Sequence, residues 1–489
     1  MPPDAVGFPS RTAAARATGT AAEGEGTPVS PRDMRRAGLC VGCGACVSRS
    51  PGAGARMMLD GDGELKPTGP EAWMAHRSDE LARLCPFSPS AADETTLARA
   101  LYPDALNADP LIGRFESAYV GHAAEGQFRA EGSSGGLVSW VAAELLRLGL
   151  VDGVAHVGEG DSPGEGEPFF RYRISRSPEE VCRAAKSRYY PVEMSGVLST
   201  IRAVPGRYAV VGVPCFIKAV QLLRREDPVV RERVAFTLGL FCGHMKSARM
   251  VESFAYQAGV RLEDVRQIDF RVKDPRRPAN WYTVQFTQRD GRTFRHDWFH
   301  LAEGDWGSGF FQNAACNYCD DVVAETADIA FGDAWVEPYS SDGRGTNVMV
   351  VRSARLRELI DRAVVEQRLR LDEVDGAFVQ RTQAAGFRQR REGLAYRLSW
   401  PQRGVRPRKR VQPSASSLGV RRKLVYRTRA AITTWSRRLY RAAKRLRLQG
   451  LYVHWARAAT ALYQAIAYSR GSIGRALDRC GLKDETLRE

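Results

Sequence analysis

The sequence predicts an α+β fold of mixed α/β character, in which a small cysteine-bearing segment precedes a larger core and a basic helical tail. Three observations predict it. Four of the ten cysteines fall within the first 100 residues. Short apolar runs of strand length then alternate with stretches of helical periodicity up to about residue 400. Beyond that residue the chain carries 22 Lys and Arg against 4 Asp and Glu, whereas residues 1–400 hold 50 against 52.

Size and composition limit the class of protein. A chain of 489 residues is long enough for two or three domains. It contains no run of 18 apolar residues that would form a membrane-spanning helix. Residues 1–30 are rich in Ala, Gly, Pro and Thr without the apolar stretch of a secretory signal, so we expect a disordered leader. These features predict a cytoplasmic protein, in which clustered cysteines serve metal binding or redox chemistry.

The pattern divides the rest of the chain. We expect a cysteine-bearing domain at 31–110, a core in two parts at 111–205 and 206–400, and the tail at 401–489. Within these parts, turn residues and apolar periodicity predict a hairpin in 56–67, strands in 153–157, 208–213 and 235–241, a second hairpin in 281–298, and a helix over 353–374.

The most specific motif is Cys40-Val-Gly-Cys43-Gly-Ala-Cys46, with Cys85-Pro86 further along the chain. Three thiolates at this spacing can hold one face of a [4Fe–4S] cubane, and the glycines let the backbone approach the sulfides. Zinc is the alternative, but zinc sites usually pair two separated Cys-x-x-Cys units or add histidine. The four cysteines therefore predict a ferredoxin-like [4Fe–4S] site.

A second group of four cysteines is more scattered. Cys215 and Cys242 each follow an apolar, strand-like run, while Cys316 and Cys319 form a two-ligand clip. Together they are sufficient for a second cluster. Alternatively, Cys215 and Cys242 are buried core thiols and only the clip binds metal. Spacing alone leaves both interpretations open. The two remaining cysteines, Cys182 and Cys480, are expected to be structural.

A Gly/Ser loop, Gly132-Ser133-Ser134-Gly135-Gly136, precedes a predicted helix. Free N–H groups and the helix dipole at such a position favour an anion such as a phosphate. The loop would also serve as an ordinary helix cap that binds nothing, and it is not the Gly-x-Gly-x-x-Gly fingerprint. Lys186 is a candidate to neutralise a phosphate or a reduced flavin; the alternative is that it is a solvated surface lysine. Asp333 is a candidate flavin contact; the alternative is that it is only a polar residue at a strand end.

Taken in order, these motifs resemble the beta subunit family of coenzyme F420 hydrogenase/dehydrogenase, which includes reductases acting on 7-hydroxymethyl chlorophyll a. The resemblance covers roughly residues 35–400. The matching motifs are Cys40/Cys43/Cys46 with Cys85-Pro86, Ser133-Ser-Gly-Gly136, Lys186-Ser-Arg-Tyr189, Gly212-Val-Pro-Cys215, Phe241-Cys-Gly243, Cys316-Asn-Tyr-Cys319-Asp320 and Ala327-Asp-Ile-Ala-Phe-Gly-Asp333-Ala-Trp335.

The resemblance implies FAD and two 4Fe-4S clusters, held in an N-terminal ferredoxin-like segment and in a flavin- and cluster-binding core. It implies that the second cluster is held by Cys215, Cys242, Cys316 and Cys319. The flavin contacts that it implies are Gly132, Ser133, Ser134, Gly135, Gly136 and Lys186, with Asp333, Thr346 and Asn347 as further candidates. One departure from the family is the pair Val213 and Phe216 around Pro214-Cys215, where members often carry Thr and Gln. Apolar groups there change the hydrogen bonding that tunes a cluster.

The predicted function is therefore that of an iron–sulfur flavoprotein oxidoreductase. We expect electron transfer between a ferredoxin-like partner, the two clusters, FAD and a hydride-exchanging substrate such as coenzyme F420, in either direction. His244 is the one candidate for a catalytic acid or base; the alternative is that it is a structural histidine. The alternative function is a non-catalytic electron carrier or metal-stabilised scaffold, docked at a membrane through its tail and serving cell-surface polysaccharide synthesis.

The tail has its own pattern. Residues 401–417 are rich in Pro, Arg and Ser and suggest a linker. Two apolar stripes follow, each able to share one helix face among arginines: Leu424, Ala431, Trp435, Leu439 and Leu446, then Leu451, Trp455, Ala459, Leu462 and Ile466. This pattern favours docking of residues 401–489 on the inner membrane surface or on a protein partner. Nucleic acid is not expected, since no nucleic-acid module is recognisable.

Overall fold

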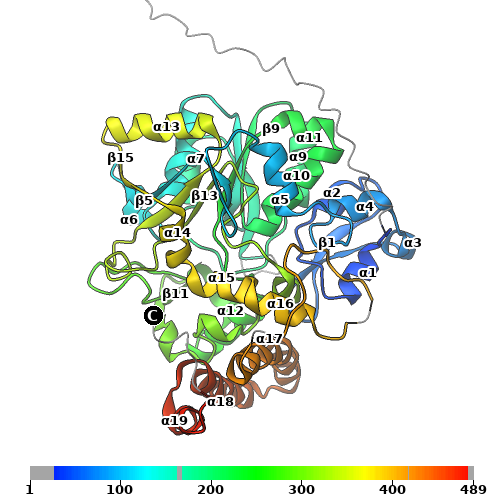
Figure 1. Ribbon diagram of the computed structural model, residues 1–489, viewed down its shortest axis with the longest axis vertical. Helices are drawn as coiled ribbons and strands as arrows, with labels where there is room; N and C mark the ends of the chain where they lie inside the picture. The colour runs from blue at the N-terminus through cyan, green and yellow to red at the C-terminus, as the bar shows by residue number, and fades with distance from the viewer. Residues whose placement is uncertain (1–26, 162–167, 403, 417, 483–489) are drawn as a thin grey trace, which may run out of the picture.

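An eight-stranded mixed sheet forms the centre of the core (Figure 1). The computed structural model describes residues 27–161, 168–402, 404–416 and 418–482. The strand order is β15 (Leu369–Val374), β5 (Ser117–Ala123), β14 (Asn347–Val351), β13 (Ile329–Asp333), β9 (Val234–Leu240), β8 (Tyr208–Gly212), β6 (Gly153–Glu159) and β7 (Phe170–Ser175). The four strands β13, β9, β8 and β6 are parallel, and antiparallel strands flank them on both sides. The expectation of a mixed α/β fold is confirmed.

Helices cover both faces of this sheet. The central strand β8 is buried throughout, as a continuous apolar run in a parallel sheet must be. Its Tyr208 and Val210 pack toward one face and its Ala209 and Val211 toward the other. The helices around the sheet are α6 (Phe128–Glu131), α7 (Leu137–Arg147), α8 (Pro178–Arg183), α9 (Ser195–Ala203), α10 (Pro214–Glu226), α11 (Pro228–Arg233) and α13 (Ala354–Val365). Helices α9 and α10 pack on one face, and α7 and α13 on the other.

The helix predicted over 353–374 is wrong in its second half. Helix α13 ends at Val365, and Gln367 adopts a left-handed φ of 58°. The chain then reverses into β15, which pairs with β5 at the edge of the sheet. An edge strand that pairs with a segment far away in sequence leaves no local signal, because its periodicity continues that of the helix before it.

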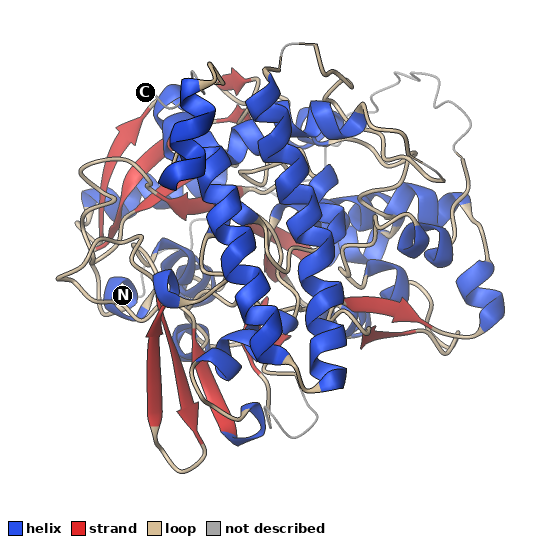
Figure 2. Cartoon of the chain, turned by 90° about the horizontal axis from the view of Figure 1, so that it is seen from below, coloured by secondary structure: helices blue, strands red, loops and turns tan. Residues whose placement is uncertain are grey.

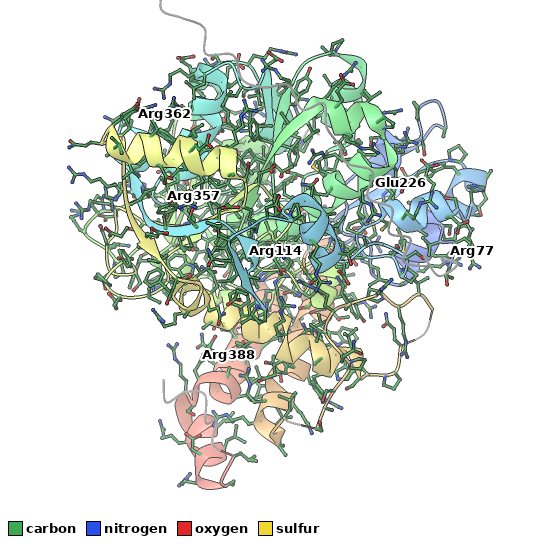
Figure 3. All side chains as sticks on the ribbon, turned by 45° about the horizontal axis from the view of Figure 1, so that its top comes forward. Arg77, Arg114, Glu226, Arg357, Arg362 and Arg388 are labelled. Carbon is green, nitrogen blue, oxygen red and sulfur yellow. The ribbon has the colours of Figure 1, made fainter. Side chains whose placement is uncertain are left out.

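The cysteine-bearing segment packs beside α9 and α10 at one end of the sheet (Figure 1). It contains α1 (Pro31–Arg36), α2 (Ala45–Ser48), β1 (Arg56–Leu59), β2 (Leu65–Thr68), α3 (Glu71–Ala75) and α4 (Asp79–Leu84). Strands β1 and β2 form the predicted hairpin. Ser30 caps α1 through a reciprocal capping box with Asp33. Arg83 of α4 pairs with Glu226 of α10, which Figure 3 labels, at 3.0 Å.

The remaining elements complete the core around the sheet. They are α5 (Glu94–Leu101), β3 (Asn107–Asp109), β4 (Gly113–Phe115), α12 (Arg249–Gln257), β10 (Val265–Asp269), β11 (Thr283–Gln288), β12 (Thr293–Asp297), α14 (Gly376–Thr382), α15 (Ala384–Arg390) and α16 (Glu392–Leu398). Short 3-10 helices lie at η1 (Leu262–Asp264), η2 (Trp298–His300), η3 (Trp306–Ser308) and η4 (Ala314–Tyr318). Strands β11 and β12 form the second predicted hairpin.

The tail is packed on the core. Helices α17 (Val420–Leu446) and α18 (Gln449–Tyr468) are followed by α19 (Gly471–Arg479). Seen from below in Figure 2, α17 and α18 lie side by side across the molecule. The stretch expected to be a linker is anchored, since Arg410 pairs with Glu325 at 2.6 Å and Lys409 with Asp320 at 3.0 Å. In the part of the chain that the structure describes, no helix has the length and apolarity to span a bilayer.

Candidate functional site

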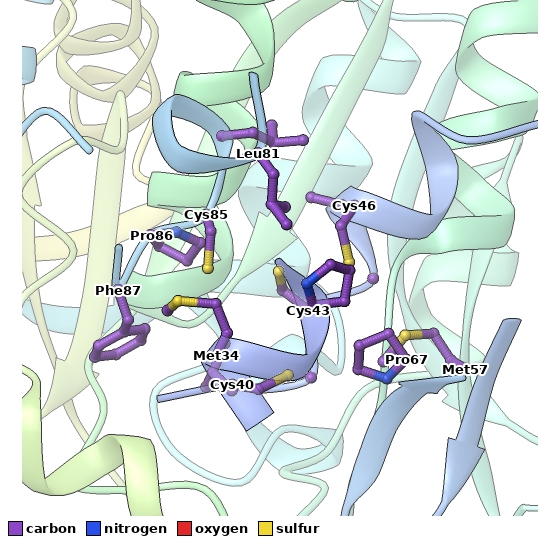
Figure 4. Close-up of a pocket in the computed structure, with 16 residues that line it drawn as sticks. Met34, Cys40, Cys43, Cys46, Met57, Pro67, Leu81, Cys85, Pro86 and Phe87 are labelled. Atoms are coloured by element: carbon purple, nitrogen blue, oxygen red, sulfur yellow. The ribbon is translucent and has the colours of Figure 1, made fainter. Parts of the chain in front are cut away.

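The four N-terminal cysteines meet at one apolar pocket. Figure 4 shows Cys40, Cys43, Cys46 and Cys85 together, and Met34, Leu81 and Phe87 contribute to the wall. Gly42 and Gly44 both have φ of +83°, a left-handed conformation that favours glycine. A Cβ on Gly44 would lie 2.8 Å from the amide of Ser195, and one on Gly42 would meet the carbonyl of Leu65. The glycines thus let the cysteine loop approach its neighbours closely.

Burial shapes the chemistry of these thiols. It raises the pKa of Cys85 to about 12 and the pKa of Cys43 further, and neighbouring cysteines reinforce the rise for Cys43. A bound metal centre opposes this effect, because it stabilises the thiolate form. Four half-buried cysteines around an apolar pocket fit a [4Fe–4S] cluster. Among the described residues, no three or more His, Cys, Asp or Glu side chains are arranged to hold a single metal ion.

The second group of cysteines is also brought together. Cys215 lies in the first turn of α10, Cys242 follows β9, and Cys316 and Cys319 lie at η4. Burial raises the pKa of Cys242 to about 12 and that of Cys316 to about 11, and Cys316 and Cys319 are among the charges that act on Cys242. Burial and then the three other thiols of the group raise the pKa of Cys215. The alternative of two isolated core thiols is therefore disfavoured.

Backbone and side-chain donors surround this second group. The amide of Met245 donates to Cys316 Sγ at 3.3 Å. Arg390 Nη2 donates to the carbonyl oxygens of Cys242 at 2.8 Å and Gly243 at 2.6 Å. A buried guanidinium beside several thiolates supplies compensating positive charge, and donors to sulfur are among the means by which a protein sets a cluster's potential. The donor set fits a second cluster.

The two cysteine groups are neighbours. Both lie in one buried apolar cluster of side chains, and Cys43 contributes to the raised pKa of Cys215. Tyr172 sits beside both, since burial and then Cys215 and Cys43 raise its pKa. Its ring stacks on Phe216 with centroids 6.1 Å apart, and its hydroxyl donates to the Val211 carbonyl at 2.9 Å. An apolar, aromatic contact therefore joins the two groups.

The carboxyl edge of the parallel strands gathers the second cysteine group and several flavin candidates. Cys215 follows β8, Cys242 follows β9 and Asp333 ends β13, and these three strands are adjacent. Strand β14 runs antiparallel, so its first residue Asn347 pairs with Asp333 at the same edge. In open sheets of this kind, ligands bind beyond the carboxyl ends of the strands.

The Gly/Ser loop precedes α7 at this edge, as predicted, and hydrogen bonds connect it to the other candidates. Ser133 Oγ accepts from the amide of Ser187 at 2.9 Å, which places Lys186 beside the loop. Ser134 Oγ donates to the Thr346 carbonyl at 3.0 Å. Asn347 Oδ1 accepts from the amide of Leu137, the first residue of α7, at 3.2 Å. The structure thus brings Gly132–Gly136, Lys186, Thr346 and Asn347 into one region.

Lys186 is held in an unusual conformation. Its φ is 126°, which non-glycine residues rarely adopt, and such strain concentrates at functional sites. Its Nζ pairs with Asp269 at 3.2 Å, and its side chain is only 21% exposed. Lys186 is therefore not a freely solvated surface lysine.

A basic cleft adjoins the loop, and sequence reasoning missed it. Its volume is about 460 Å³, within the usual range for cofactor sites. The residues that line it are His122, Ala123, Ala124, Gly126, Arg129, Ala130, Lys273, Pro275, Arg344 and Arg370. Lys273 Nζ donates to the Ser134 carbonyl at 2.8 Å, so cleft and loop share a wall. The available signal was local: Arg129 and Arg344 lie within three residues of Gly132 and Thr346 in the sequence.

Electrostatics make this cleft a site for anions. Burial and then Lys186, Arg129 and Arg271 lower the pKa of Lys273 to about 7. Burial, Arg129 and Arg370 lower the pKa of His122 to about 4. Crowded cations depress one another's pKa in this way, and a phosphate between them would relieve the repulsion.

His244 lies away from this cleft. It is buried, its ring stacks on Trp306 at 4.4 Å, and its Nδ1 contacts Arg429 of α17 at 3.4 Å. Burial and then Lys246 and Arg429 lower its pKa well below the usual range. These contacts favour the structural alternative over an acid–base role.

Comparisons with known proteins identify the core. Residues 118–199 match a family model described as coenzyme F420 hydrogenase/dehydrogenase, beta subunit N-term, and residues 206–377 match the C terminus model of the same subunit. The coenzyme F420-dependent sulfite reductase of Methanocaldococcus jannaschii is 22% identical over 259 residues, which are 50% of this chain and 37% of that protein. The chain therefore spans little more than a third of that relative. A chain in the F420-reducing [NiFe] hydrogenase complex from Methanosarcina barkeri matches 58% of this chain and 93% of its own, at 19% identity and a TM-score of 0.45.

Proposed function

Because the chain belongs to the coenzyme F420 hydrogenase/dehydrogenase beta subunit family, we propose that it is an iron–sulfur flavoprotein oxidoreductase that uses two 4Fe-4S clusters and FAD. We further propose that it exchanges electrons with a ferredoxin-like carrier and a hydride with coenzyme F420 or a related acceptor, as a cytoplasmic protein. One observation carries this proposal: a group of four thiols and a basic cleft at a Gly/Ser loop both lie at the carboxyl edge of the sheet.

The cysteine groups supply the proposed cluster ligands. Cys40, Cys43, Cys46 and Cys85 would hold one cluster, and Cys215, Cys242, Cys316 and Cys319 the other. When bound, the clusters exchange single electrons and the flavin exchanges a hydride, so that together they connect one-electron and two-electron carriers. Tyr172 and Phe216 provide an apolar contact beside both groups.

The cleft would hold the flavin nucleotide through its phosphates. The amides of Gly132–Gly136 lie at the start of α7, where the helix dipole favours an anion. Arg129, Lys273 and Arg344 add positive charge from three other segments. Asp333 is bound by Arg271, so its carboxylate serves to hold that arginine in place at the edge of the sheet.

The proposal is tested by anaerobic purification, with quantification of iron, acid-labile sulfide and flavin. We expect about eight irons and one FAD per chain, since two [4Fe–4S] clusters hold four irons each. Reduction of the purified protein by reduced ferredoxin, followed by transfer to coenzyme F420, would then be measured from the visible spectra. Iron and sulfide without flavin would support the electron-carrier alternative. Zinc without flavin would refute the redox function altogether.

A further inference from the structure

The outer surface of the tail is apolar and basic at once. Nine of the 19 large apolar side chains that are exposed in the described residues lie between residues 420 and 473, although this stretch is only about a ninth of the chain. They are Val420, Leu424, Trp435, Leu446, Leu448, Leu451, Leu462, Tyr468 and Ile473. Leu446 and Leu451 are each 68% exposed and Trp435 is 49% exposed. Apolar residues gathered in this way mark an interaction surface.

This surface follows one face of α17. Exposed residues recur at helical spacing along it: Val420, Leu424, Arg427, Ala431, Trp435, Arg438, Ala442 and Arg445. Four of the five members of the apolar stripe noted in the sequence are therefore exposed: Leu424, Ala431, Trp435 and Leu446. Leu451 and Leu462 extend the surface onto α18, which lies beside α17 in Figure 2.

The opposite face of α17 fixes this orientation. Arg437 pairs with Glu64 of the cysteine-bearing segment at 2.5 Å, and Ser436 Oγ accepts from the amide of Phe311 at 3.0 Å. Thr433 donates to the Gly309 carbonyl at 3.1 Å. Arg429 is buried and donates to Gln312 at 3.0 Å. These polar side chains of α17 contact the core. Of the apolar stripe, Leu439 packs against the core, whereas Leu424, Ala431, Trp435 and Leu446 stay exposed among the described residues.

Charge identifies the kind of partner. Residues 420–482 contain 15 Lys and Arg and one acidic residue, Asp478, which pairs with Arg421. Arg438 lies over the Trp435 ring at 5.7 Å, and Arg470 over the Tyr468 ring at 5.7 Å. A second copy of this chain docked on the same face would bring like charges together. A partner must therefore be anionic and must also accept exposed leucines.

We propose that the outer face of α17–α19 binds the surface of a membrane that contains anionic lipids. Two helices side by side present an extended plane rather than a pocket, and at 1.5 Å per residue α17 is about 40 Å long. Leucines can enter the boundary of the acyl chains, Trp435 and Tyr468 suit the headgroup level, and the arginines bind lipid phosphates. Protein hot spots instead cluster near the centre of an interface. This inference does not depend on the proposed redox chemistry.

The test is flotation of the full-length holoprotein with vesicles. One set contains phosphatidylglycerol and phosphatidylcholine, and the other contains phosphatidylcholine alone. We expect flotation with the anionic vesicles only, decreasing as salt is raised. Absence of flotation with anionic vesicles, or equal flotation with both sets, would overturn the proposal. An acidic protein that binds this face in place of vesicles would overturn it as well.

Matched variants separate this face from charge in general. Arg438→Glu with Arg445→Glu changes two exposed arginines seven residues apart on α17, and we expect binding to fall at least about tenfold. The control is Arg355→Glu with Arg362→Glu, at the same spacing on α13 at the opposite end of the molecule (Figures 1 and 3). Arg355 also lies over an aromatic ring, that of Phe236, at 5.3 Å. An equal loss in both variants would contradict a specific face.

A second pair of variants tests insertion of apolar side chains. Leu446→Ser with Leu451→Ser should weaken binding about tenfold at low and at high salt, because the lost contribution is apolar burial. Val365→Ser on α13 is the control, since Val365 is 84% exposed. Unchanged iron content and thermal unfolding in each variant would show that the fold is intact. Unaltered vesicle binding by the Leu446 and Leu451 variant would refute insertion.

Discussion

Arg271 holds Asp333 at the carboxyl end of β13 through both carboxylate oxygens, with Nη1 2.9 Å from Oδ2 and Nη2 3.3 Å from Oδ1. The guanidinium also lies over the rings of Tyr282 at 4.4 Å and Trp335 at 5.7 Å. Its side chain is 7% exposed, and Asp333 and two tyrosines raise its pKa well above the usual range. Arg271 follows β10, which pairs with β11, so this ion pair joins the small sheet of β10, β11 and β12 to the carboxyl edge of the large sheet.

Removal of Arg271 should destabilise the protein and lower its flavin content. We expect Arg271→Ala to lower the free energy of unfolding by about 3–5 kcal/mol, because the Asp333 carboxylate loses its buried partner. Urea unfolding and flavin content would measure both effects. The variant Asp333→Asn together with Arg271→Met should recover part of the stability, since no charge is then left unpaired. A double variant as unstable as Arg271→Ala would contradict this account.

The Gly/Ser loop depends on Gly136. Its φ is +81°, and a Cβ there would meet the backbone of Phe128 and lie 2.7 Å from the amide of Arg129. We expect Gly136→Ala to lose flavin. We also expect it to lower the unfolding temperature much more than Gly149→Ala does. Gly149, after the other end of α7, has a φ of +58° with no atom within 4 Å of a Cβ, so that variant tests backbone strain alone, about 1–2 kcal/mol. Equal effects would show that close approach is not important at Gly136.

Much of this site follows from local sequence, and the rest depends on the fold. The cysteine loop, the hairpin of β1 and β2, and the Gly/Ser loop before α7 are short-range patterns, which is why the sequence predicts them. The basic cleft is not local, because Arg129 comes from α6 and Lys273 and Arg344 come from two loops far along the chain, which only the fold brings together. The same limit applies to β15, whose partner β5 lies some 250 residues earlier.

The tail shows a second limit. Periodicity identifies the apolar stripe of α17, but it does not decide which face is buried. Apolar residues usually face the core, whereas the arginines beside this stripe favour docking on a membrane surface or a partner, and spacing alone does not choose between the two. The structure buries another face of α17, which carries Ile432 as well as Arg429 and Arg437. The two arginines bind Gln312 and Glu64, which lie in distant segments. Long-range contacts of this kind cannot be read from helical spacing.

Substitution of one cysteine in either group should remove about half of the bound iron. We expect Cys46→Ser to lose about four of eight irons and Cys242→Ser to lose the other four, with acid-labile sulfide falling in parallel. Cys182→Ser on α8, outside both groups, should retain all of the iron and is the matched control. Iron and sulfide assays after anaerobic purification measure this. A Cys242→Ser protein with full iron content would remove Cys242 from the proposed ligands.

Arg410 should stabilise the protein far more than its neighbour Arg408. Arg410 bonds to both carboxylate oxygens of Glu325, at 2.6 and 2.7 Å, whereas Arg408 is exposed. We expect Arg410→Met to cost about 1.5–3 kcal/mol, because the buried Glu325 carboxylate then keeps only its longer contact with Arg391, at 3.3 Å. Arg408→Met should change stability by less than about 0.5 kcal/mol. Thermal unfolding of the two variants in parallel provides the measurement, and similar unfolding temperatures would show that residues 401–416 do not brace the core.

The cleft should bind FAD in a pH-dependent manner through Lys273. Its pKa is about 7 in the folded chain against an ordinary value of 10.5, so between these values the unfolded chain binds a proton that the folded chain lacks. Without ligand, stability should therefore rise with pH across this window. The FAD pyrophosphate favours the protonated lysine, so affinity should fall as pH rises through about 7, by up to about tenfold per unit. Titration of flavin-depleted protein with FAD from pH 6 to pH 9 measures this, and Lys273→Met should flatten the profile while Lys273→Arg retains the affinity. A profile for Lys273→Met that still falls through neutrality would assign the proton to another group.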